Sequence, residues 1–97
     1  MKITLHTILG IKEIVGQRQM EIALPANSII QDLLNLLKEK WGDKLAGRLF
    51  DSDSGAVLPY VQIMINGRAI HFLQGMETPL KEGDEVLILP PVSGGAH

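Results

Sequence analysis

Apolar and polar residues alternate over the first part of the chain. In residues 2–9, one side of the alternation consists of Ile3, Leu5, Thr7 and Leu9. In residues 19–24, the corresponding side consists of Met20, Ile22 and Leu24. A period of two is typical of strands that bury one face. The glycine-bounded segment GIKEIVG, residues 10–16, lies between the two runs. The pattern therefore predicts a β-hairpin with this segment as a short connection.

The apolar spacing changes from two to a helical period after Pro25. The apolar residues at this spacing are Ile29, Ile30, Leu33, Leu34, Leu37 and Trp41. Ser28 lies three residues before Gln31, the spacing of a capping box, in which both side chains satisfy free amides of the first turn. Gly42 is a residue type that commonly ends a helix. The sequence therefore predicts one amphipathic helix over residues 28–41.

Residues 43–59 are less regular. Leu45, Leu49 and Phe50 indicate a short helical turn within this stretch. The polar run DSDSG, residues 51–55, contains the Asp-x-Asp pattern found in some calcium-binding loops. The glutamate that completes such a twelve-residue loop is missing. A plain polar loop is therefore the preferred interpretation.

The last third of the chain predicts three more strands. Residues 61–65 alternate, and Asn66-Gly67 is a strong signal for a two-residue hairpin turn. Residues 68–73 then return as an antiparallel strand, and residues 75–84 are rich in turn-forming types. Residues 85–89, EVLIL, are apolar on both faces. Such a run is typical of a strand in the middle of a sheet.

The predicted element order is ββαβββ, or ββαββ if the fourth strand is short. One helix covers only one face of such a sheet, so the sheet curls around it and leaves its other face open. If the first and last strands are parallel neighbours at the centre, the apolar character of residues 85–89 is explained. We therefore predict an α+β fold of the β-grasp type, with a mixed sheet of four to five strands around one main helix.

The composition agrees with one small domain. The chain has 97 residues, of which 45% are hydrophobic, and this is sufficient for a single core. Its net charge of −2 gives no electrostatic footprint for nucleic acid or for a membrane surface. No apolar run approaches the ~20 residues of a membrane-spanning helix, and we expect a cytoplasmic protein.

The candidate chemistry of the side chains is sparse. There is no cysteine, and His6, His71 and His97 have no metal-ligand spacing, so we expect neither a disulfide nor a metal site. No Ser-His-Asp set, phosphate-binding loop or paired carboxylate site stands out. Glu82, Asp84 and Glu85 cluster, but a solvated turn explains them. The side chains therefore do not indicate that the chain is an enzyme by itself.

The end of the chain carries a family resemblance. Residues 80–95, LKEGDEVLILPPVSGG, resemble the end of the ubiquitin-like sulfur carriers. The similarity is closest to the small subunit of molybdopterin synthase, whose chains finish on Pro-Pro-Val-x-Gly-Gly. Thiamine-pathway carriers share the fold and the Gly-Gly end but generally lack the two prolines. The opening strand, the GIKEIVG segment and the helix fall in the matching order, so the resemblance covers almost the whole chain.

The resemblance implies chemistry at Gly95. In the family, an adenylating enzyme of the ubiquitin-activating type uses ATP to activate the final carboxyl, and sulfur then displaces AMP to leave a thiocarboxylate. A sulfur-accepting biosynthetic enzyme consumes this group, and the carrier itself binds no cofactor. The implied organisation is a β-grasp domain over residues 1–91 and a flexible tail over residues 92–97. The residues that precede Gly95 are Pro90 and Pro91, at the end of the domain, and Val92, Ser93 and Gly94, in the tail.

The sequence departs from the family at Ala96-His97, which follow the second glycine. Some relatives carry such extensions, which a metal-dependent, deubiquitinase-like protease removes, and this implies a processing site between Gly95 and Ala96. The extension favours amino-acid or siderophore sulfur assembly, whereas the two prolines favour molybdopterin. An alternative is that these two residues are a remnant of an expression vector.

Two other fates of the chain stay open. Both a sulfur carrier and a ubiquitin-like modifier pass through the adenylate, so the chain is alternatively a modifier conjugated through Gly95. It is otherwise a plain β-grasp binding domain with an inert tail.

The last strand also suggests where partners dock. If Val86 and Ile88 face the helix, Leu87 and Leu89 point to the open face of the sheet, beside the tail. The resemblance implies that this pair, with His6 and Ala69 nearby, is a docking patch for the adenylating enzyme. The alternative is that a loop covers these side chains.

Overall fold

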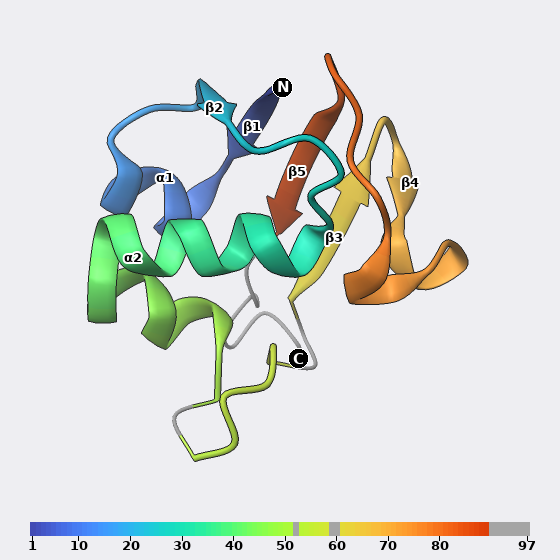
Figure 1. The fold of residues 1–97 in the computed structure, drawn as a ribbon. Coiled ribbons are helices and arrows are strands. Elements are labelled where there is room, and N and C mark those ends of the chain that lie inside the picture. Colours follow the sequence, from blue (N-terminus) through green and yellow to red (C-terminus); the bar gives the residue numbers. More distant parts are fainter. Residues whose placement is uncertain (52, 59–60, 90–97) are drawn as a thin grey trace.

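The computed structural model of the chain describes residues 1–51, 53–58 and 61–89 (Figure 1). The strands are β1 (Lys2–Thr7), β2 (Gln19–Ala23), β3 (Gln62–Ile65), β4 (Arg68–Ala69) and β5 (Glu85–Leu89). The helices are α1 (Leu9–Val15) and α2 (Ile30–Leu49), with short 3₁₀ helices η1 (Ile70–Phe72) and η2 (Gly75–Glu77). The strands form one five-stranded sheet in the order β2-β1-β5-β3-β4, and α2 lies across one of its faces (Figure 1). This is the predicted β-grasp fold.

The last strand lies at the centre of the sheet, as its apolar sequence predicts. β5 pairs in parallel with β1, where Leu5 stands beside Val86, and antiparallel with β3, where Ile63 stands beside Ile88. β5 has a neighbour on each side and α2 over one face, which accounts for the buried Val86 and Ile88, whereas the apolar Leu87 and Leu89 lie on the face that α2 does not cover. The expected parallel pairing of the first and last strands is confirmed.

The core forms between α2 and the sheet. Leu33, Leu34 and Leu37 of α2 are each no more than 1% exposed, and Val86 and Ile88 of β5 are completely buried. Full burial of each such side chain contributes about 1.5–3 kcal/mol to folding. The helical period of α2 and the period of two in β5 direct these residues to the same interior. This shared core fixes which face of β5 remains open.

The connection between the first two strands is a helix and not a simple loop. β1 ends at Thr7, whose N–H donates to Arg18 O over 2.8 Å, and α1 follows at once. Ile11 in α1 is 1% exposed, and α1 packs against α2. Gly16 ends this helix with a φ of 86°, in the left-handed region. The predicted short connection was wrong because a seven-residue segment is too short for its helical spacing to stand out.

The main helix begins two residues later than predicted, and its capping differs. Ser28 Oγ donates to Pro25 O over 2.8 Å, which closes the turn before the helix. The N–H of Ile29 donates instead to Asp32 Oδ2 over 2.9 Å. The predicted Ser28–Gln31 capping box was therefore wrong by one position. Asp32 takes the role expected of Gln31, because its short carboxylate accepts a hydrogen bond from a first-turn amide.

Gly42 bends α2 rather than ending it. Its φ of 61° and ψ of −146° lie outside the helical region, and a second helical segment follows to Leu49. Leu45 and Leu49 are each 1% exposed, so the expected helical turn in this stretch is confirmed and is longer than predicted. The bend turns the second segment so that it covers the end of the core.

The backbone at Gly42 leads to a stability prediction with a matched control. An added Cβ meets no atom within 4 Å at either Gly42 or Gly47, but only Gly42 has a positive φ. Gly42→Ala is expected to lower the free energy of unfolding by about 1–3 kcal/mol, because the residue must keep a strained conformation. Gly47→Ala, in the second helical segment, is expected to raise it by about 0.5–1 kcal/mol. Urea denaturation of both variants checks this, and equal signs would contradict the interpretation.

The second hairpin has the predicted turn but a shorter return strand. Asn66 and Gly67 have φ values of 51° and 86°, as a type I′ turn requires. The return strand β4 holds only two residues, and the chain then enters η1. The predicted strand over residues 68–73 was therefore too long. Alternation alone does not show the difference, because an edge strand has a partner on one side only.

Candidate functional site

The side chains of β5 divide between the two faces of the sheet. Val86 and Ile88 are buried under α2, whereas Leu87 and Leu89 are half-buried on the opposite face. The predicted orientation of these four side chains is therefore confirmed. The docking role of Leu87 and Leu89 stays a prediction.

Strand register brings three of the predicted docking residues into one line. His6 of β1 pairs with Leu87 of β5, Leu87 pairs with Met64 of β3, and Met64 pairs with Ala69 of β4. We call His6, Leu87, Met64 and Ala69 the open-face row. Leu89 lies on the same face, one alternation further along β5. Met64 was missed in the sequence, although the alternation that places Ile63 and Ile65 inside also places Met64 outside.

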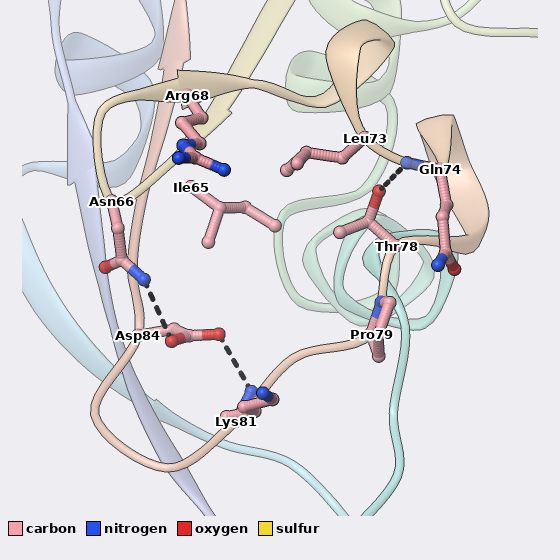
Figure 2. Close-up of a pocket in the computed structure, with 9 residues that line it drawn as sticks. All are labelled: Ile65, Asn66, Arg68, Leu73, Gln74, Thr78, Pro79, Lys81 and Asp84. Carbon is pink, nitrogen blue, oxygen red and sulfur yellow. Dashed lines mark hydrogen bonds between the residues drawn. The ribbon is translucent and has the colours of Figure 1, made fainter.

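A hydrogen-bonded bridge holds the start of β5 beside the β3–β4 turn. Asn66 Nδ2 donates to Asp84 Oδ1 over 3.0 Å, and Lys81 N donates to Asp84 Oδ2 over 2.8 Å (Figure 2). The amide of Glu85 donates to Asn66 Oδ1 over 2.9 Å. These contacts fix the position at which the chain enters β5, and therefore the register of the open-face row.

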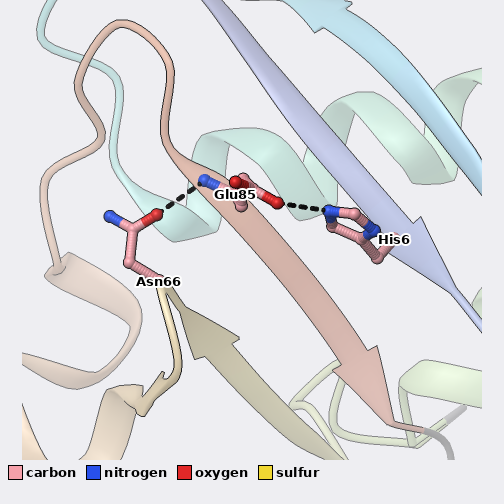
Figure 3. Close-up of polar contacts among 3 residues, drawn as sticks. All are labelled: His6, Asn66 and Glu85. Atoms are coloured by element: carbon pink, nitrogen blue, oxygen red, sulfur yellow. Dashed lines mark hydrogen bonds and ion pairs between the residues drawn. The ribbon is translucent and has the colours of Figure 1, made fainter.

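A side-chain hydrogen bond borders the row on the side of the strand entry. His6 Nε2 and Glu85 Oε1 are 2.9 Å apart, with the side chains 32% and 63% exposed, and Asn66 holds the Glu85 backbone from the other side (Figure 3). Such an exposed pair contributes at most ~1 kcal/mol to stability. Its effect is to orient the His6 ring and the Glu85 carboxylate on the open face.

These groups surround a shallow hollow. Its volume is about 540 Å³, and it is lined by His6, Met64, Asn66, Gly67, Glu85 and Leu87. Sequence reasoning assigned Asn66 to a turn and Glu85 to a solvated cluster, so it missed both as parts of this surface. The signal that could have found them is the hairpin turn itself, because it must lie next to the strand that pairs with β3. The arrangement is a shallow surface that combines apolar and polar side chains.

The predicted reactive segment follows directly after β5. The tail positions Pro90, Pro91, Val92, Ser93, Gly94, Gly95 and Ala96 lie outside the described residues. The adenylation site at Gly95, the processing site before Ala96 and the flexibility of residues 92–97 therefore stay predictions. The described structure places the strand that leads into them, with Leu89 paired to Gln62 at the end of β5.

Two further features were searched for in the described part of the chain. Within residues 1–51, 53–58 and 61–89, no three His, Cys, Asp or Glu side chains gather closely enough to hold a metal ion. In the same ranges, no helix has both the length and the apolar character needed to cross a bilayer.

Comparison with known proteins identifies the family. Residues 10–95 match the model of the ThiS family. The chain belongs to the ThiS family. The match covers most of the described fold and runs on through the sequence to position 95, the second glycine of the Gly-Gly pair. The resemblance seen in residues 80–95 is thus confirmed, and the chain is a member of the ubiquitin-like sulfur carrier and modifier group.

Relatives of this ThiS-family chain carry names from both halves of that group. It is 37% identical to small archaeal modifier protein 3 of Haloferax volcanii over 98% of this chain and 100% of the relative. It is 38% identical to the sulfur carrier protein CysO of Mycobacterium tuberculosis over 53% and 56% of the two chains. The solution structure of small archaeal modifier protein 1 from Methanosarcina acetivorans superimposes with a TM-score of 0.80 at 28% identity, covering 97% and 96%. These relatives are small carrier or modifier proteins.

Proposed function

We propose that this chain is a sulfur carrier whose reactive group is the carboxyl of Gly95, exposed by removal of Ala96-His97. The observation that carries the proposal is the family match, which ends at position 95, the second glycine. The two residues beyond it fall outside the match. A carboxyl at Gly95 would therefore form the end of the segment that has the family pattern.

The proposed chemistry needs no catalytic side chain from this protein. A metal-dependent protease hydrolyses the Gly95–Ala96 peptide bond, and the new carboxylate attacks the α-phosphorus of ATP on an adenylating enzyme. Pyrophosphate leaves and an acyl adenylate forms; hydrosulfide then displaces AMP and leaves the thiocarboxylate. A biosynthetic enzyme takes this sulfur for molybdopterin or for an amino acid or related metabolite. ATP belongs to the activating partner, and glycine suits the tail because no Cβ blocks a narrow channel.

The open face supplies the docking surface for the adenylating enzyme. Leu87 and Leu89, with His6, Met64 and Ala69, offer apolar contact beside the strand end from which the tail continues. Gly95 follows Leu87 by eight residues, and an extended chain spans at most about 3.3–3.6 Å per residue. The carboxyl can therefore reach a nucleotide site roughly 27 Å from the docked row. Because Leu87 and Leu89 belong to β5, an enzyme docked on them would also fix the position of the strand end that precedes the tail.

Intact mass spectrometry tests the proposal. The chain ending at Gly95 is incubated with its adenylating enzyme, ATP and a sulfide donor, and the chain that retains Ala96-His97 is the matched control. We expect the trimmed chain alone to gain the mass that corresponds to replacing one oxygen by sulfur. If the trimmed chain is never converted, the sulfur-carrier proposal fails.

A second candidate is a protein modifier conjugated through Gly95. It is favoured by the 37% identity to small archaeal modifier protein 3 over almost the whole of both chains. In this reaction a lysine amine of a target, instead of hydrosulfide, displaces AMP and forms an isopeptide bond. Peptide mapping of proteins from the host cell would then show a Gly-Gly remnant on target lysines. The absence of such remnants under sulfur and oxidant stress would count against conjugation.

A further inference from the structure

Two large apolar side chains stand in solvent next to each other. Phe72 is 79% exposed and Leu73 is 37% exposed. Among the described residues, these are the large hydrophobic side chains that remain exposed to solvent. A single exposed apolar residue is ordinary, but adjacent large ones suggest a binding surface. They lie at the place where β4 ends early, so a continued edge strand is replaced by η1.

The turn that presents these side chains is held by its own hydrogen bonds. Leu73 N donates to Ile70 O over 2.8 Å, and Gln74 N donates to Thr78 Oγ1 over 3.1 Å. Thr78, only 6% exposed, donates in turn to Gly75 O over 2.7 Å. The centroids of the His71 and Phe72 rings are 4.1 Å apart. Phe72 and Leu73 are thus displayed by a structured turn.

A cleft of about 620 Å³ opens beside this turn. Its lining includes Ile65, Asn66, Arg68, Leu73, Lys81 and Asp84. In Figure 2, Leu73 and Arg68 both extend over the cleft toward Ile65, which forms its apolar floor. The cleft therefore combines an apolar centre with the side chain of Arg68 at its border.

The lining side chains carry a net positive charge, because Arg68 and Lys81 are two cations against the single carboxylate of Asp84. Asp84 already accepts hydrogen bonds at both carboxylate oxygens, from Asn66 Nδ2 and from Lys81 N. Arg68 and Lys81 are the two cations among the lining residues, and both are exposed. An apolar floor bordered by these cations is complementary to an apolar side chain that has carboxylates next to it.

The cleft and the open-face row lie on opposite sides of the β3–β4 hairpin. Arg68 pairs with Ile65, and Ala69 pairs with Met64. Because successive residues of a strand point to opposite faces, the first pair belongs to the cleft and the second to the open-face row. An adenylating enzyme on the open-face row would therefore leave most of the cleft uncovered, and the two surfaces meet only at Asn66, which borders both.

We propose that Phe72, Leu73 and this cleft form a second protein-docking surface. Its occupant is a segment of a protein partner in which an apolar side chain is flanked by Asp or Glu. The apolar side chain packs on Leu73 and Ile65, the carboxylates face Arg68 and Lys81, and Phe72 extends the contact area. The proposal does not depend on the chemistry at Gly95.

Site-specific photocross-linking tests this surface. A benzophenone amino acid replaces Phe72 in the full chain in its host cell, and the matched control carries it at Lys40, an exposed position on α2. On irradiation the ketone inserts into a C–H bond of whatever lies against it. We expect a discrete adduct at position 72 that is absent at position 40. Sequencing of the linked partner peptide is expected to show an apolar residue with neighbouring Asp or Glu.

Charge reversal provides the second arm. Arg68→Glu in the cross-linking chain is expected to reduce the yield of the adduct about tenfold, as for an interface charge that matters. Arg48→Glu, the same change in the last turn of α2, is expected to leave the yield unchanged, and thermal melts confirm that both variants are folded. No adduct, an adduct with the mass of two copies of this chain, a linked peptide without carboxylates, or an adduct insensitive to Arg68→Glu would each overturn the proposal.

Discussion

Replacement of Gly95 by valine is expected to abolish pyrophosphate release by the adenylating enzyme while the free energy of unfolding changes by no more than about 0.5 kcal/mol. The carboxyl of residue 95 must enter the nucleotide site through a channel suited to glycine, and a branched side chain obstructs it. The core of the protein is complete at β5, where Val86 and Ile88 are fully buried. We therefore expect a side chain added at position 95, six residues beyond Leu89, to contribute little to this core.

The measurement uses chains that end at residue 95, with pyrophosphate release and a thermal melt followed on the same samples. Ser93→Val is the matched control, because it places the same side chain at the variable position of the Pro-Pro-Val-x-Gly-Gly pattern. We expect this control to retain most of the activity. Undiminished pyrophosphate release from Gly95→Val would show that Gly95 is not the activated residue. A large loss of stability would show that the tail is structural.

The second large effect is expected on the open face. Leu87→Lys should raise KM for adenylation at least about tenfold and leave kcat nearly unchanged, because hot-spot residues near the centre of an interface dominate binding. Leu87 lies between His6 and Met64 in the open-face row, so docking would bury the new ammonium without a designed partner. In the free protein the lysine remains hydrated beside the exposed Glu85, and the fold should tolerate it.

Asn35→Lys is the matched control for this variant. It adds the same charge at an exposed position of α2, on the other side of the sheet. We expect its KM to equal that of the unmodified chain within error. Steady-state pyrophosphate assays over a range of carrier concentrations separate KM from kcat, and thermal melts exclude unfolding. An unchanged KM for Leu87→Lys would mean that the adenylating enzyme binds elsewhere.

Both predictions depend on the position of β5. Its inward residues Val86 and Ile88 fasten the strand to the core, its outward residue Leu87 joins the open-face row, and the tail continues from its end. The strand is therefore fixed by the fold, exposes part of Leu87 on the open face and precedes Gly95 in the sequence. This explains why a docking change and a tail change are expected to affect the same reaction while leaving the stability of the protein nearly intact.

Features that depend on local patterns were determined by the sequence alone. The apolar run at 85–89 predicts a central strand, and the strand is central, although its outward residues Leu87 and Leu89 lie on an open face. Asn66-Gly67 predicts its hairpin turn because both residues tolerate positive φ. The helical spacing between Leu33 and Leu37 predicts the buried face of α2. The family resemblance lies in residues 80–95, where the proposed chemistry would use the backbone carboxyl and no assembled side chains.

Tertiary structure decided the features for which local patterns are weak or ambiguous. Residues 9–15 become α1 because Ile11 finds a buried place at α2, and Gly42 bends the helix because Leu45 and Leu49 must also reach the core. Strand register, which depends on pairing between distant segments, brings Met64 and Glu85 to the predicted patch and aligns His6 with Leu87. The early end of β4 exposes Phe72, since no second neighbour holds an edge strand in place.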